Sequence, residues 1–150
     1  MYNKNMKPEV LHYLKTQRIG VLAVEMMDGS PHAATVHFAH SEEPFLFYFE
    51  TYKDSLKAQP LFGRNRTRAS FVVGSDEGTM KTLQVDGTVE LLKPEEKNIF
   101  DSIYLEKFPK KKEKSKDPKF VFFKFTPTWW RFTDWTNPQG KIILLSNCVD

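Results

Sequence analysis

Residues 45–58 read FLFYFETYKDSLKA. This stretch opens with five consecutive apolar residues, a run of strand length rather than helix length. Such a run predicts a central strand that is covered on both faces. The chain then turns polar at Thr51 and begins a short helical segment at Ser55, which we expect to break near Pro60 and Gly63. A buried strand that leads into a helix start is therefore predicted.

The sequence before this stretch predicts a helix and a β-hairpin. The hairpin turn is Asp28-Gly29, a pair that tolerates the positive φ angles of a tight turn. The expected elements are, in order, a helix from Pro8 that ends before Gly20, strands at residues 19–26 and 31–39, and a polar turn at residues 41–44.

The sequence after this stretch predicts more strands and one longer helix. The helix begins at Pro94 and repeats apolar residues at helical spacing as far as Tyr104. Gly87 interrupts a strand and indicates a bulge or a close backbone approach. The lysine-rich run 110–116 is too charged to bury and predicts a solvated connection. The remaining strands are expected at residues 69–73, 80–92, 120–135 and 141–146, the last two around a turn at residues 137–140.

Strands dominate this order, without the regular alternation with helices that a parallel sheet requires. A closed or split antiparallel β-barrel with flanking helices satisfies the order, because closure removes exposed sheet edges. The length of 150 residues fits one domain over residues 1–150, and 13 Phe residues require a substantial core. We predict a mainly β fold built as a single barrel domain.

Composition and charge exclude several classes of protein. The net charge of +3 is too small to indicate nucleic-acid binding, although residues 64–68 and 110–116 are basic. The first twenty residues hold neither the apolar core of a signal peptide nor a membrane span, so we expect a cytoplasmic protein without a membrane partner. The single cysteine, Cys148, permits no intrachain disulfide.

Four histidines raise the question of a metal site. His32 and His40 share a strand face but would lie about 26 Å apart if that strand is continuous, and His37 is on the opposite face. The sequence therefore predicts no metal site.

The polar segment after the apolar strand combines the groups that a phosphate needs. Thr51 and Ser55 supply hydroxyls, Lys57 supplies a positive charge, and the helix start supplies unpaired backbone N–H groups. The alternative interpretation is that Ser55 or Asp54 only caps the helix and that Lys57 is solvated.

Residues 128–135 carry three indoles and one guanidinium. Aromatic faces can stack on a planar ligand, and arginine can neutralise a negative one. Strand alternation places Trp129, Arg131 and Thr133 on one face and Trp130, Phe132 and Asp134 on the other. One set belongs to the core, and the sequence leaves open which.

The chain resembles the pyridoxamine-phosphate-oxidase-like family of FMN-binding split β-barrels, in particular its small general-stress-protein branch. The resemblance rests on the order and spacing of PHAATV (31–36), FLFYF (45–49), TYKDSLKA (51–58), ASFVV (69–73) and LQVDGTVE (83–90). It implies that Thr51, Ser55 and Lys57 bind the FMN phosphate. The other cofactor residues that it implies are Thr35, Val36, His37 and Phe38 along the isoalloxazine ring, Thr82 and Gln84 on a later strand, and Trp129, Trp130 and Arg131 near the C-terminus.

Two positions depart from the family's pattern. Leu56 stands where the family usually has an arginine, and Ala34 lies near the place of another. Both arginines bind phosphate in the prototype enzyme, so the departures argue against pyridoxamine phosphate oxidation itself.

The resemblance implies a homodimeric FMN-dependent oxidoreductase that acts on an unidentified small molecule. FMN is the expected cofactor, with a deazaflavin or a haem as alternatives. The alternative function is a protein that binds or sequesters flavin or haem without turnover.

Overall fold

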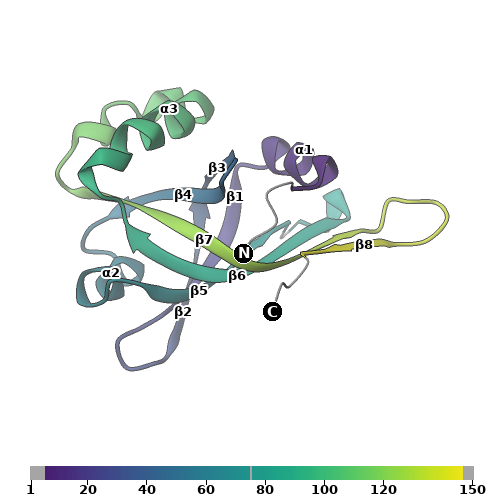
Figure 1. The fold of residues 1–150 in the computed structure, drawn as a ribbon, viewed down its shortest axis with the longest axis horizontal. Helices are drawn as coiled ribbons and strands as arrows, with labels where there is room; N and C mark the ends of the chain where they lie inside the picture. Colours follow the sequence, from purple (N-terminus) through teal and green to yellow (C-terminus); the bar gives the residue numbers. More distant parts are fainter. Residues whose placement is uncertain (1–5, 75, 147–150) are drawn as a thin grey trace.

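The computed structural model describes residues 6–74 and 76–146, which form one curled antiparallel sheet with helices around it (Figure 1). The strand order is β2-β1-β5-β6-β7-β4-β3, and β8 pairs with β7. The strands are β1 (Ile19–Glu25), β2 (Pro31–His37), β3 (Ala39–Glu42), β4 (Phe45–Tyr52), β5 (Thr67–Val73), β6 (Lys81–Leu91), β7 (Phe120–Asp134) and β8 (Ile142–Leu145). The helices are α1 (Pro8–Thr16), α2 (Gln59–Gly63) and α3 (Lys97–Lys107), with short 3-10 turns η1 (Leu56–Ala58), η2 (Glu77–Thr79), η3 (Pro94–Glu96), η4 (Pro109–Lys111) and η5 (Lys114–Lys116). The predicted mainly β fold is confirmed, as a half-barrel.

The sheet curls until β2 and β4 lie side by side. No hydrogen-bonded ladder joins these two strands in the described ranges. β3 is short and pairs with β4 only from Phe45 to Tyr48, so the second half of β4 has no ladder on that side. We call this open junction between β2 and the second half of β4 the seam.

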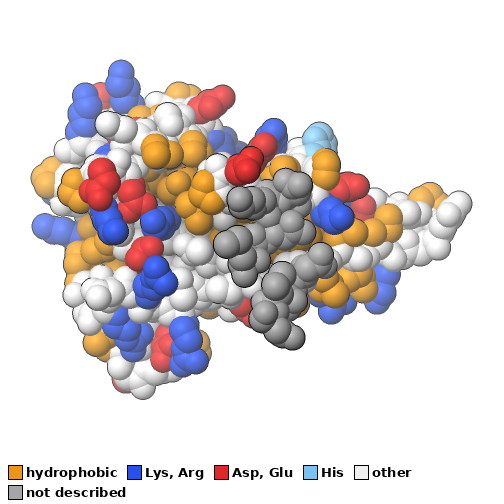
Figure 2. All heavy atoms as spheres, viewed as in Figure 1, with side chains coloured by type: hydrophobic (Ala, Val, Ile, Leu, Met, Phe, Trp, Pro, Cys, Tyr) orange, Lys and Arg blue, Asp and Glu red, His pale blue; other side chains and the backbone are white. Residues whose placement is uncertain are grey.

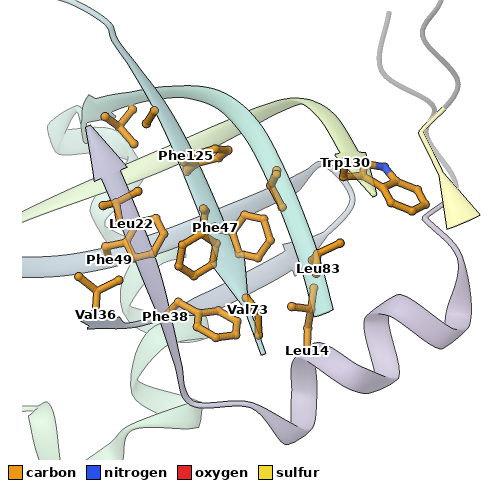
Figure 3. Packing of buried hydrophobic residues seen from close by; sticks show 14 of the residues in the cluster. Leu14, Leu22, Val36, Phe38, Phe47, Phe49, Val73, Leu83, Phe125 and Trp130 are labelled. Carbon is orange, nitrogen blue, oxygen red and sulfur yellow. The ribbon is translucent and has the colours of Figure 1, made fainter. Parts of the chain in front are cut away.

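Aromatic side chains fill the inside of the half-barrel (Figure 3). Phe47 meets the rings of Phe38, Phe71 and Phe125 edge to face, with ring centroids 5.8, 5.0 and 6.0 Å away. The aromatic quadrupole favours this geometry. On the other side of β4, Tyr48 packs against α3. The apolar run is therefore covered on both faces, as predicted, but it lies next to the edge strand β3 rather than at the centre of the sheet.

The segment between the hairpin and β4 differs from the sequence prediction. Residues 31–39 are not one strand, because the chain breaks at Phe38, whose side chain is fully buried in the core. Residues 39–42 form β3 and pair with β4, so the predicted polar turn is confined to residues 43–44. The break lets the chain leave the side of β1 and join β4 at the far end of the sheet order.

Gly87 lies at a β-bulge, since the register of β6 against β7 shifts between Asp86 and Gly87 and leaves Thr128 of β7 as the extra residue. A Cβ atom at position 87 would collide with the carbonyl oxygen of Thr126, so this close approach of two strands requires glycine. Pro60, by contrast, does not break the helical segment. It occupies the first turn of α2, where a missing N–H is tolerated.

β7 changes partner along its length. It pairs with β6 over residues 123–134, and on its other side it pairs with β4 over residues 120–125 and with β8 over residues 131–134. β8 and the end of β7 project from the body as a terminal hairpin (Figure 1). Hydrophobic side chains gather along this hairpin (Figure 2), and its exposed apolar residues are Trp135, Ile142, Ile143 and Leu145.

None of the helices in residues 6–74 and 76–146 is long and apolar enough to span a lipid bilayer. In the same ranges, no three His, Cys, Asp or Glu side chains come together as metal ligands would. His32 and His40 lie on different strands rather than on one. Cys148 lies outside the described residues.

Candidate functional site

The polar end of β4 brings two hydroxyl groups together. Thr51 is buried near the end of the strand, and Ser55 directly precedes η1. Their Oγ1 and Oγ atoms lie 3.1 Å apart, so one hydroxyl donates to the other. Ser55 stands at the N-cap position of η1 but makes no capping hydrogen bond with its side chain. The capping interpretation of Ser55 is therefore wrong, because its hydroxyl pairs with Thr51 instead.

Lys57 is a half-buried cation in η1. Its ammonium forms no ion pair or hydrogen bond with any other described residue. Burial lowers the pKa of Lys57 below its ordinary value, because the charged form loses hydration. A partly desolvated ammonium without a counter-ion marks a place where an anion would be stabilised.

β2 lies beside η1 and carries the predicted ring-binding segment. Thr35 and His37 are exposed on it, whereas Val36 is buried and Phe38, just beyond the strand, is fully buried. The side chains of Val36 and Phe38 therefore belong to the core. Only their backbone groups are available to a ligand on the outer side.

A second set of predicted residues lies on the outer face of the sheet. Gln84 is paired with Arg131 across β6 and β7, and Thr82 lies two residues before Gln84 on the same face. Neither Gln84 nor Arg131 has a polar side-chain partner among the residues that the structure describes. Both therefore remain available to a ligand or to a partner chain.

The burial of the β7 side chains shows which of the two alternating sets belongs to the core. Trp130 and Phe132 are core side chains, only 5% and 2% exposed, so Trp129 and Arg131 point to the outer face. Thr133 shares the outer face of the strand but is itself buried. Trp130 stabilises the core, and little of its indole is available to a ligand.

The two sets of polar residues are far apart on one chain. Thr51 is paired with Val121 on β7, and Arg131 lies ten residues later on the same strand. Ten residues of an antiparallel strand span about 30 Å. In Figure 1, α2, which follows η1, and β8 accordingly lie at opposite ends of the molecule. This separation exceeds the length of a flavin nucleotide.

The seam contains an ion pair that the sequence analysis did not single out. Glu50 on β4 is 5% exposed and Lys111 in η4 is 16% exposed, and their side chains lie 3.1 Å apart. The prediction that residues 110–116 are too charged to bury is therefore wrong at Lys111. Glu50 carried the missed signal, because a carboxylate within an otherwise apolar strand requires a partner when it is buried.

A cavity of about 430 Å³ lies between β3 and α3. His40 lines it, and the Nδ1 atom of this ring is buried without a hydrogen-bond partner among the described residues. Burial, with a smaller contribution from Lys107, lowers the pKa of His40 to about 4. The ring is thus neutral at neutral pH. None of the predicted cofactor residues lines this cavity.

The sequence model of pyridoxamine 5'-phosphate oxidase matches residues 6–134. The chain belongs to the pyridoxamine 5'-phosphate oxidase family. All the predicted cofactor residues of this family member fall within the matched region. No curated protein sequence matches the chain.

Solved structures share the fold of this pyridoxamine 5'-phosphate oxidase family member. A haem-binding protein from Mycobacterium smegmatis has a TM-score of 0.70 at 15% identity, over 93% of this chain and 59% of that one. A protein from Clostridium acetobutylicum related to general stress protein 26 has a TM-score of 0.63 at 16% identity, over 91% of each chain. The haem storage protein HutZ from Vibrio cholerae has a TM-score of 0.63 at 14% identity, over 82% of this chain and 90% of that one. This chain therefore spans only 59% of the length of the Mycobacterium protein, and the likeness establishes the split-barrel fold alone.

Proposed function

We propose that this chain binds FMN and acts as a flavin-dependent oxidoreductase on a small molecule. The observation that carries the proposal is the half-buried Lys57, which follows the Thr51–Ser55 hydroxyl pair and has no counter-ion among the residues that the structure describes. A phosphate would supply the missing negative charge and would accept hydrogen bonds from the ammonium and a hydroxyl. The chain belongs to the pyridoxamine 5'-phosphate oxidase family, whose split barrels bind FMN, and this membership supports FMN as the source of that phosphate.

The ring of the proposed cofactor would lie along β2. This strand is next to η1, and its exposed side chains Thr35 and His37 face away from the core. Bound FMN would supply the electron transfer to or from a substrate, while the chain positions the cofactor and excludes water from it.

Lys57→Ala is expected to weaken FMN binding by about 1.5–3 kcal/mol, the range for a hydrogen bond to a charged group, or roughly 10- to 150-fold in dissociation constant. Riboflavin, which has no phosphate, should bind more weakly than FMN and should not respond to the substitution. Fluorescence titration of both ligands measures the effect.

The matched control for this experiment is Lys53→Ala, which removes an exposed lysine four residues away. It should leave both affinities unchanged. Equal binding of FMN and riboflavin by the unmodified protein, or an unchanged FMN affinity in Lys57→Ala, would show that these residues do not hold the phosphate.

We also propose that the protein is a homodimer with shared flavin sites. Each site would take Thr51, Ser55 and Lys57 from one subunit and residues near Arg131 from the other. Two observations support this arrangement: the distance between the two sets on one chain, and the exposed apolar side chains of the terminal hairpin, which a second subunit would cover.

Mixing Lys57→Ala chains with Arg131→Ala chains is expected to restore flavin content partly, toward one normal site per heterodimer. The reason is that one site of the mixed dimer carries both substitutions and the other carries neither. Flavin absorbance of the purified mixture measures the recovery. A monomer at micromolar concentration in sedimentation would refute the dimer, and a dimer without recovery would refute the shared site.

A second candidate function is binding or sequestering a planar ligand without turnover. The fold likeness to a haem-binding protein favours it, as do Leu56 and Ala34 at the places of phosphate-binding arginines. The absorption spectrum of the purified protein distinguishes flavin from haem. Reduction of the loaded protein by nicotinamide nucleotides, in the presence of an acceptor, distinguishes an oxidoreductase from a binding protein.

A further inference from the structure

Lys111 lies at the seam, where three separate parts of the chain meet. Its Nζ atom is 3.1 Å from Oε1 of Glu50 on β4. The same atom is 3.1 Å from the hydroxyl of Tyr104 on α3 and 3.1 Å from Nδ1 of His37 at the end of β2. Lys111 therefore bridges two strands that no ladder joins in the described ranges.

These contacts fix the hydrogen-bond role of the His37 ring. An ammonium group has three donors and no acceptor, so each of the three contacts uses one donor. The Nδ1 atom of His37 must then accept. A neutral imidazole that accepts at Nδ1 carries its proton on Nε2. No described residue forms a hydrogen bond with Nε2, and the His37 side chain is exposed.

The surroundings of His37 disfavour its protonated form. Partial burial lowers the pKa of His37 below its ordinary value, and neighbouring positive charges lower it further. Glu50, the carboxylate at the seam, is engaged by Lys111. The ring also packs against Phe108, with 5.2 Å between centroids. The positive groups that face His37 are Arg18 before β1, Lys107 on α3, Lys111 in η4 and Lys114 in η5.

We propose that Lys111 is a positioning residue that holds His37 as a neutral imidazole with a free Nε2–H, so that the seam offers a hydrogen-bond donor to an acceptor atom of its ligand. Carbonyl oxygens and ring nitrogens of a flavin are such acceptors, and this use of His37 rests on the proposed flavin function. The protonation state itself does not depend on that function.

The same arrangement makes His37 unsuited to haem. A histidine that ligates a metal presents the lone pair of one ring nitrogen and usually donates from the other to a carboxylate or carbonyl. Here the only lone pair of the neutral ring is at Nδ1, where the Lys111 ammonium occupies it. The contact thus favours an acceptor-rich ligand over haem iron at this position.

The test is nuclear magnetic resonance of the ligand-free full chain labelled with 15N-histidine, with His37→Gln used to assign the signals. At pH 7 we expect His37 in the neutral form with the proton on Nε2. A mixture of the two neutral forms, or a proton on Nδ1, would overturn the proposal. This measurement needs no variant at position 111 and no flavin.

Substitution then tests whether Lys111 is the cause. Lys111→Met should raise the pKa of His37 and mix the two neutral forms, whereas Lys114→Met should raise the pKa and leave the proton on Nε2. The control removes a neighbouring charge without removing a contact to the ring. If Lys111→Met is unstable because Glu50 loses its partner, the double variant Glu50→Gln/Lys111→Met replaces it. The same proton position in all variants would overturn the role of Lys111.

Ligands separate this proposal from the proposed function. Adding FMN should shift the Nε2–H signal of His37, and adding haemin should give a Soret band that is identical in the unmodified protein and in His37→Gln. A haemin spectrum that changes in His37→Gln would overturn the proposal. An unshifted signal with FMN bound would overturn the use of His37 as a donor to the ligand, and absence of FMN binding would refute the proposed function alone.

Discussion

Glu50→Leu is expected to lower the free energy of unfolding by about 3–5 kcal/mol, the range for removing one partner of a buried ion pair. The leucine fits an apolar strand, so the loss would come from Lys111, whose side chain is only 16% exposed and would lose its carboxylate partner. Urea unfolding followed by far-ultraviolet circular dichroism measures the change. A loss below about 1 kcal/mol would match an exposed ion pair and would contradict the burial of this one.

The double variant Glu50→Leu/Lys111→Met is the control for this result. It removes both charges and keeps apolar volume in the seam, so most of the lost stability should return. The coupling between the two substitutions then gives the interaction of this pair. Lys110→Met, on the exposed neighbour of Lys111, should change stability little.

Lowering the pH from about 6.5 to about 4 is expected to remove about 3 kcal/mol of stability through His40 alone. The unfolded chain binds a proton on this imidazole near pH 6.5, but the native protein binds it only near pH 4. Between these values the unfolded state binds more protons. The contribution of His40 is therefore complete above pH 6.5 and is lost as the pH falls toward 4.

His40→Phe isolates this contribution, because phenylalanine keeps a ring beside the cavity and does not titrate. The charged groups near His40 are Lys107, Lys15 and Glu42, and they remain in the variant. As the pH falls, the free energy of unfolding of the unmodified protein should decrease relative to that of the variant. His12→Gln, on an exposed position of α1, should keep the acid dependence of the unmodified protein. Parallel stability profiles for His40→Phe and the unmodified protein would contradict the buried neutral ring.

Local patterns predicted much of the fold. The apolar run of β4, the hairpin turn, the bulge at Gly87 and the helix after Pro94 each follow from spacing and residue type within a short window. The proximity of the polar residues Thr51 and Ser55 also follows from the local sequence, because they are only four residues apart, on either side of a turn. The hydrophobic period and the residue composition are sufficient to predict structure where neighbours in the sequence are also neighbours in space.

Long-range contacts could not be predicted in this way. The charge of residues 110–116 indicates solvation on average, but it does not show that Lys111 reaches Glu50 across the seam. Alternation paired Trp130 with Phe132, but only the curl of the sheet shows that this pair faces the core. The break at Phe38 is likewise decided by a distant strand, since residues 39–42 leave β1 to pair with β4.

Because β7 changes partner along its length, we expect its two ends to open to solvent separately. Residues 126–129 have no ladder on the side of β4 and β8 in the described ranges, and the register shift at Gly87 leaves Thr128 of β7 as the extra residue at the same level. β8 contacts mainly β7, and only Leu144 of this strand packs on the core. The terminal hairpin can therefore open while the phenylalanine core stays intact. We therefore expect its amide hydrogens to exchange with solvent through a local opening, and those of residues 120–125 to exchange more slowly.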